Sequence, residues 1–108
     1  MLDLDGDTDT DVSAINATAV TALGGRGNDI INAANVTSYF LDLHGGLNDD
    51  TLVGGNRADV LAGEEDRDYI FSRDSVADVV QGGSGLEDSA TIDVFDQTQM
   101  TGVEHPSF

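Results

Sequence analysis

The stretch Gly45–Phe71 decides the fold, and it reads GGLNDDTLV (45–53), GGNRADVLA (54–62) and GEEDRDYIF (63–71). Each nonapeptide begins with Gly, carries Asp at position 6 and carries a large aliphatic residue at position 8. These residues are Asp50, Asp59 and Asp68, followed by Leu52, Leu61 and Ile70. Because the aliphatic residue keeps a fixed phase to the Asp, the pattern indicates one structural unit repeated three times.

The same phase extends toward the N-terminus with one interruption. Gly24–Asn32 reads GGRGNDIIN and is the most complete match, with Asp29 at position 6. Residues 33–44 then break the period, and their length fits a three-residue bulge plus one nonapeptide. Within them, LDL at 41–43 predicts two inward-facing leucines on either side of an outward-facing Asp.

The phase also continues toward the C-terminus. RDSVADVVQ (73–81) restores Asp78 at position 6 after a one-residue insertion. In GGSGLED (82–88) Glu87 occupies the expected place, and a turn one residue longer makes Asp88 the equivalent acid. The last strand should comprise Ala90, Ile92, Val94 and Phe95, and the residues after it should cover the open end of the array.

The first residues, LDLDGDTDTDV (2–12), carry alternating Asp residues. An EF-hand loop is excluded, because its twelfth position would be Asn16 or Ala14, where Glu is required. Asp11 lies 18 residues before Asp29, so this segment is either a degenerate first repeat or a frayed acidic N-terminus. Residues 15–23 should form a strand without a metal-binding turn.

The composition argues against several kinds of partner and site. The chain has 108 residues, 21 acidic side chains against 4 basic ones, and a net charge of −17. Such a charge disfavours nucleic acid as a partner and opposes compaction unless counter-charge is supplied. Without Cys, neither disulfides nor zinc–thiolate sites can form. No apolar run approaches the roughly 20 residues that span a bilayer.

One nonapeptide cannot enclose a core, so two of them should form a flattened coil of 18 residues. Its glycine-rich positions 1–6 should turn, and positions 7–9 should form a short strand. Coils would stack through parallel strands about 4.8 Å apart. The prediction is an all-β, right-handed parallel β-roll of about four to five coils, forming one domain over 1–108. Its parts are a degenerate N-terminal coil (1–23), the repeats (24–90) and a C-terminal cap (91–108).

Turns on one side of such a roll recur every second nonapeptide, which arranges the position 6 acids in two columns. One column contains Asp11, Asp29, Asp50, Asp68 and Asp88, and the other contains Asp59 and Asp78. Like charges this close would repel by a few kcal/mol per pair in a partly desolvated turn. Divalent cations between the turns would remove that repulsion.

The ligand chemistry favours calcium over softer metals, since the candidate ligands are oxygen atoms and not His or Cys. Roughly five ions would offset about ten negative charges. Backbone carbonyl groups at positions 1 to 4 should complete each site. The expected contributors are Gly24, Arg26, Gly27, Gly45, Leu47, Gly54, Asn56, Gly63, Glu65, Gly82 and Ser84.

GGRGNDIIN at 24–32 and GGLNDDTLV at 45–53 resemble the RTX, or haemolysin-type, calcium-binding repeats of secreted bacterial proteins. The resemblance covers roughly residues 24–104. It implies a β-roll that is disordered without calcium and folds on binding it, export through a type I system, and an upstream domain in a longer protein. It also implies that the position 6 acids from Asp29 to Asp88 are ligands. Glycine is missing at position 4 in Asn48, Arg57 and Asp66 and at position 2 in Glu64, which marks weaker or empty sites.

Two other functions have less support. Catalysis is not expected, because His44 and His105 are isolated and Ser84 lacks the second Gly of a nucleophile elbow. An adhesion, ice-binding or other ligand-binding module on the same roll is the alternative, but an ice-binding face needs a regular Thr row. Position 7 instead holds Ile30, Thr51, Val60, Tyr69 and Val79. We therefore expect an extracellular, calcium-binding structural module.

Overall fold

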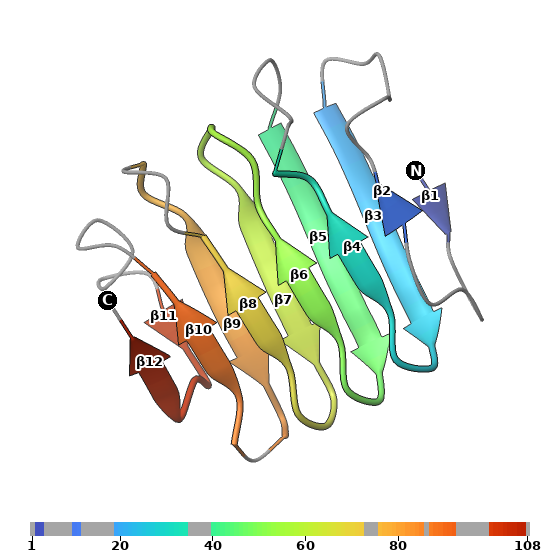
Figure 1. Ribbon diagram of the computed structural model, residues 1–108, viewed down its shortest axis with the longest axis vertical. Helices are drawn as coiled ribbons and strands as arrows, with labels where there is room; N and C mark the ends of the chain where they lie inside the picture. Colours follow the sequence, from blue (N-terminus) through green and yellow to red (C-terminus); the bar gives the residue numbers. More distant parts are fainter. Residues whose placement is uncertain are drawn as a thin grey trace.

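The computed structural model describes residues 2–3, 10–11, 19–34, 40–72, 76–85, 87–92 and 100–107. All regular structure in these residues is β-strand, arranged as two parallel six-stranded sheets (Figure 1). The first sheet contains β1 (Leu2–Asp3), β3 (Ala19–Arg26), β5 (Phe40–Leu47), β7 (Val60–Glu64), β9 (Val79–Gly83) and β11 (Met100–Thr101). The second contains β2 (Thr10–Asp11), β4 (Ile30–Asn32), β6 (Thr51–Val53), β8 (Tyr69–Phe71), β10 (Ser89–Thr91) and β12 (His105–Ser107).

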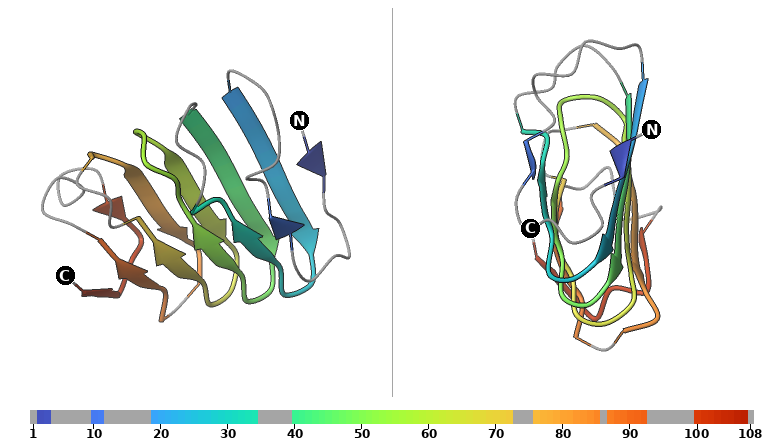
Figure 2. Two further views of the ribbon diagram at one scale, coloured as in Figure 1. Left: turned by 45° about the horizontal axis from the view of Figure 1, so that its top comes forward. Right: turned by 90° about the vertical axis from the view of Figure 1, so that its right-hand side faces the viewer.

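The chain alternates between the two sheets, so an odd-numbered strand and the next even-numbered strand make one coil. β3 to β10 make four such coils, and the short strands β1, β2, β11 and β12 flank them. Viewed along the stack, the coils superimpose as a flattened loop (Figure 2). The architecture is a parallel β-solenoid of about four turns with coils of roughly 19 residues, which confirms the predicted fold class. The interruption expected at 33–44 lies in a coil of 21 residues, because Ile31 of β4 pairs with Leu52 of β6.

The core is a single layer of side chains from position 8 and its equivalents. On the second sheet Ile31, Leu52, Ile70 and Ala90 stack in register and are at most 1% exposed. On the first sheet the corresponding buried stack is Ala22, Leu43, Leu61 and Val80. The molecule is accordingly thin, with a shortest extent of 15 Å. Little apolar area is buried per coil, so polar groups in the turns carry weight in the stability.

In the first sheet the glycines at positions 1 and 2 lie in strands, whereas a turn over positions 1–6 is the expectation; Gly54 and Gly55 lie between β6 and β7. Gly45 and Gly46 are the sixth and seventh residues of β5, and Gly82 and Gly83 end β9. A Cβ on Gly46 would collide with the carbonyl oxygen of Gly25 in the neighbouring coil. Glycine is needed there for close approach between coils, and the turn itself is confined to the few residues before the Asp.

The ends of the chain continue the stack. At the C-terminus β11 pairs with β9 and β12 pairs with β10, so the described part of the expected cap adds strands to both sheets. Ile92 is buried beside the core, whereas Val94 and Phe95, also expected in the last strand, lie outside the described residues. At the N-terminus β1 and β2 extend the same sheets. No helix long and apolar enough for a membrane span occurs in the described ranges.

Candidate metal centre

Four buried aspartates form a column along the turns that join the first sheet to the second, at the lower edge in Figure 1. We call Asp29, Asp50, Asp68 and Asp88 the long column; none is more than 2% exposed. The backbone N–H of Asp29 donates to Oδ1 of Asp50 at 2.7 Å, and that of Asp50 donates to Oδ1 of Asp68 at 2.9 Å. The N–H of Asp68 donates to Oδ1 of Asp88 at 2.8 Å. Asp50, Asp68 and Asp88 therefore each tie their coil to the coil before it.

A second column occupies the opposite edge and contains Asp59 and Asp78, which we call the short column. The N–H of Asp59 donates to Oδ1 of Asp78 at 2.7 Å, across 19 residues. One coil earlier, Leu41 occupies the equivalent place, and its N–H donates to Oδ1 of Asp59 at 2.9 Å. The predicted division into two columns is confirmed, including the absence of an acid before Asp59 among the described residues.

The prediction that Asp11 heads the long column is wrong. Strand register pairs Asp11 with Asn32 and Thr10 with Ile31, so Asp11 is three places beyond the level of Asp29. The 18-residue spacing fails here because the coil leading to Ile31 has 21 residues. Within residues 6–14, where a degenerate first repeat was expected, the structure describes only Thr10 and Asp11.

The long column ends on a residue that the nonapeptide pattern did not identify. Glu104 accepts the N–H of Asp88 at Oε2, with a distance of 3.0 Å, in the same way that each Asp accepts from the coil before it. The turn before Glu104 is shorter than the others, so counting in nines does not find it. Its separation of 16 residues from Asp88 could have suggested it.

One carboxylate oxygen in each of three coils has no hydrogen-bond partner. The Oδ2 atoms of Asp50, Asp68 and Asp88 are buried and accept no hydrogen bond. A buried acceptor without a partner costs about 1–3 kcal/mol, and more when it is charged. In the short column, Oδ2 of Asp59 accepts the N–H of Gly55 at 2.8 Å. The long column thus holds a row of oxygen atoms that lack a positive partner.

Backbone carbonyl oxygens approach the same row. Gly45 lies beside Oδ2 of Asp50 and the carbonyl oxygen of Gly63, and a Cβ there would be 2.8 Å from the latter. Gly82 lies likewise beside Oδ2 of Asp88 and the carbonyl oxygen of Gly102. A carboxylate oxygen and a carbonyl oxygen from the next coil therefore converge where the glycine leaves out a side chain.

Burial makes these acids hard to ionise in the absence of a cation. It raises the pKa of both Asp50 and Asp68 to about 7. The backbone N–H group of the preceding coil offsets part of that effect, and the neighbouring acids of the column add to it. Burial also raises the pKa of Asp88, to which the charge of Glu104 contributes. A cation beside the column would favour the charged forms.

The residues expected to contribute carbonyl groups differ in how deeply they are buried. The position 1 glycines Gly24, Gly45 and Gly63 are buried, as is Gly82, whereas Gly54 is half-buried. The other residues lie on the outside: Gly27 is half-buried, and Arg26, Leu47, Asn56, Glu65 and Ser84 are exposed.

An exposed ladder of polar side chains runs outside the long column, and sequence reasoning missed it. Oδ1 of Asn48 accepts the N–H of Gly27 at 3.2 Å, and Oδ2 of Asp66 accepts the N–H of Asn48 at 3.2 Å. Asn48 and Asp66 both have positive φ, at 82° and 73°. Asn and Asp tolerate that backbone region, so their presence at position 4 in place of glycine was the available signal.

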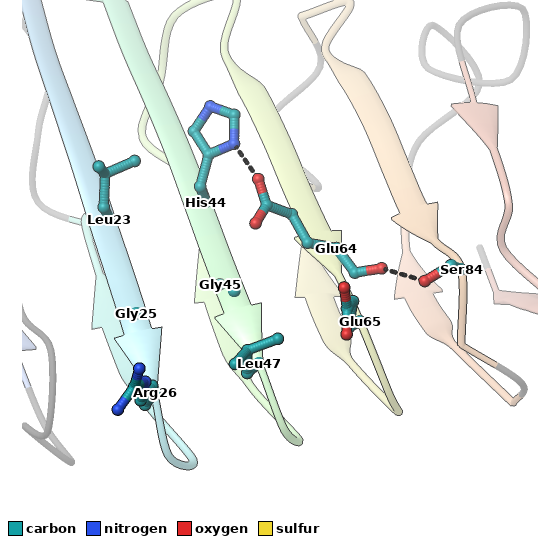
Figure 3. A pocket seen from close by; sticks show the side chains of 10 residues that line it. Leu23, Gly25, Arg26, His44, Gly45, Leu47, Glu64, Glu65 and Ser84 are labelled. Atoms are coloured by element: carbon teal, nitrogen blue, oxygen red, sulfur yellow. Dashed lines mark hydrogen bonds and ion pairs between the residues drawn. The ribbon is translucent and has the colours of Figure 1, made fainter.

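A shallow groove of about 760 Å³ crosses the outer face of the first sheet (Figure 3). His44 stands in it between two carboxylates, with Nδ1 at 2.8 Å from Oε1 of Glu64 and Nε2 at 2.9 Å from Oδ1 of Asp42. Both ring nitrogens are therefore engaged. The two acids lie on opposite sides of the ring and do not converge on one point.

Within the described ranges, no group of three or more His, Cys, Asp or Glu side chains is placed to hold a metal ion. An ion between coils would accordingly be held by about two carboxylates and by backbone carbonyl oxygens. The partnerless Oδ2 atoms and the carbonyls beside the glycines are oxygen donors of this kind. The donors fit a hard cation with flexible geometry.

Comparison with known proteins found no match to any family model, any curated protein or any solved structure.

Proposed function

We propose that the chain is a calcium-binding structural module whose folding depends on the ion. The observation that carries the proposal is the row of buried Oδ2 atoms on Asp50, Asp68 and Asp88, which have no hydrogen-bond partner. A stack of buried acids in a chain of net charge −17 opposes folding unless positive charge enters it. Divalent cations between the coils would supply that charge.

Calcium is the cation that suits these donors best. It accepts six to eight oxygen ligands in variable geometry, including carboxylates, backbone carbonyls and water. Magnesium demands nearly ideal octahedral geometry and retains its water, so a buried turn with two carboxylates suits it less. The long column would hold ions between Asp29 and Asp50, between Asp50 and Asp68, and between Asp68 and Asp88. The short column would hold one ion, between Asp59 and Asp78.

The bound ion would supply positive charge to the carboxylates, and the chain's residues would do the rest. Asp50, Asp68 and Asp88 each join two coils through Oδ1, while the position 1 glycines leave space beside Oδ2. Because no site is complete within a single coil, binding energy becomes folding energy. The thin core is consistent with that dependence.

We further propose that the module belongs to an exported bacterial protein of the RTX type and has no catalytic activity of its own. The nonapeptides at 24–32 and 45–53 support this proposal. A calcium-dependent fold would remain open inside the cell, where free calcium is scarce, and close outside it. The protein that carries the module would then acquire its stable form after export.

Isothermal titration calorimetry with calcium on the wild-type chain, Asp50→Asn and Asp59→Asn tests the proposal. Asp50 has a column acid in the coil on each side, Asp29 and Asp68. Asp50→Asn should therefore weaken the binding of two ions by about tenfold or more. Asp59 shares its column with Asp78 alone, so Asp59→Asn should weaken one ion. Magnesium at equal concentration serves as the control. A wild-type chain that binds no calcium would contradict the proposal. An equal loss of calcium affinity in the two variants would contradict the column assignment.

A further inference from the structure

The last turn of the solenoid differs from the others in length. Gly102 follows β11 in the register of Gly82, since Thr101 pairs with Gln81. The acid comes only two residues later, at Glu104, whereas Asp88 comes six residues after Gly82. Glu has one methylene group more than Asp, so its carboxylate reaches farther from the backbone of this shorter turn.

Backbone contacts fix this turn against the preceding one. The carbonyl oxygen of Asp88 accepts the N–H of His105 at 2.9 Å and that of Glu104 at 3.2 Å. Oε2 of Glu104 in turn accepts the N–H of Asp88 at 3.0 Å. Oε2 of Glu104 is thus directed toward the column, although the residue is exposed overall.

Two oxygen atoms already face this turn from inside. Oδ2 of Asp88 belongs to a residue that is 0% exposed, and it has no hydrogen-bond partner. The carbonyl oxygen of Gly102 approaches the same space beside Gly82, where a Cβ would lie 2.7 Å from that Oδ2. A carboxylate from each coil and a carbonyl oxygen therefore surround the gap between the last two turns.

We propose that Glu104 is the terminal ligand of the long column and forms, with Asp88 and the Gly102 carbonyl, one further calcium site between the last two turns. This inference rests on the proposed function. Glu104 stands outside the nine-residue pattern, so its site would add a fifth ion to the four proposed between the aspartates of the two columns. The site would also stabilise the packing of the last short strands, β11 and β12, against the rest of the stack.

Counting the ions per chain tests the assignment directly. Native mass spectrometry in calcium would compare the wild-type chain with Glu104→Gln, Glu104→Asp and Glu87→Gln. Glu104→Gln keeps an oxygen that can accept the Asp88 N–H but loses the charge, and Glu104→Asp keeps the charge but loses the reach. Both should bind one ion fewer than the wild-type chain. Glu87 is exposed and ion-paired with Arg67, so Glu87→Gln should bind the full number.

The outcomes separate this inference from the proposed function. If the wild-type chain binds calcium and both Glu104 variants bind the same number of ions, Glu104 is not a ligand, while the calcium module stands. If Glu104→Gln loses every ion, the residue supports the whole fold and the assignment of one site is wrong. If the wild-type chain binds no ion, both proposals fail. Circular dichroism in calcium would show whether each variant is folded.

Discussion

At the scale of single residues, the position 1 glycines are required as strictly as the acids beside them. A side chain on Gly45 would collide with Oδ2 of Asp50 and lie 2.8 Å from the carbonyl oxygen of Gly63. Real Cβ atoms do not approach other atoms so closely, and all of these neighbours are buried. Glycine is required there to leave room for oxygen atoms.

Gly45→Ala should therefore destabilise the calcium-bound fold by about 1–3 kcal/mol, the usual cost of overpacking. Gly54→Ala is the matched control at position 1 of the opposite turn, where the nearest neighbour of the added Cβ, Oδ2 of Asp59, is 3.2 Å away. Denaturant titration of both variants in calcium gives the free energy of unfolding. Equal losses would show that crowding beside Asp50 is not the cause.

The place of each acid in its column could be predicted from the sequence wherever the nonapeptide phase was preserved. Asp50, Asp59 and Asp68 were placed correctly, and so was Asp88, although its turn is one residue longer. Asp11 and Glu104 show where counting fails. Coil length varies in the turns, and register is set by strand pairing, so an acid at the ends of the array cannot be placed from its sequence distance alone.

At the scale of elements, the strands were easier to predict than the turns. The position 8 side chains had to face inward because strand residues alternate between two faces, and all are buried. The boundary between strand and turn was misplaced, because glycine was interpreted by its turn preference. In β5 and β9 glycine serves the close approach between neighbouring coils instead.

The long column also predicts a pH dependence for the calcium-free chain. Folding raises the pKa of Asp50 and Asp68 from 3.8 to about 7, so the folded state retains protons that the unfolded state releases. This stabilising contribution is complete below about pH 4 and is lost as the pH rises through about 7. In EDTA the chain should therefore be more folded at pH 5 than at pH 8.

Circular dichroism across this pH range measures the effect. The double variant Asp50→Asn, Asp68→Asn is neutral at both sites at every pH and should show a smaller dependence. Saturating calcium should restore the fold of the wild-type chain at pH 8, because the ion replaces the protons. An unchanged pH profile in the double variant would assign the effect to the net charge of the whole chain.

At the scale of the whole molecule, the high net charge and the small core both make the fold dependent on bound cations. A net charge of −17 is carried by a solenoid 15 Å thick with one layer of buried side chains. Such a core offsets little of the repulsion between stacked acids. The fold should consequently depend on ions distributed along its length, and coils should form together, since each candidate site needs two neighbouring coils.

Circular dichroism of the chain during a calcium titration from EDTA tests this dependence most directly. We predict a disordered spectrum in EDTA at neutral pH and a cooperative gain of β-sheet signal as calcium reaches the millimolar range, with magnesium much less effective. The same folded spectrum in EDTA and in millimolar calcium would contradict the central claim that calcium binding drives folding of this solenoid.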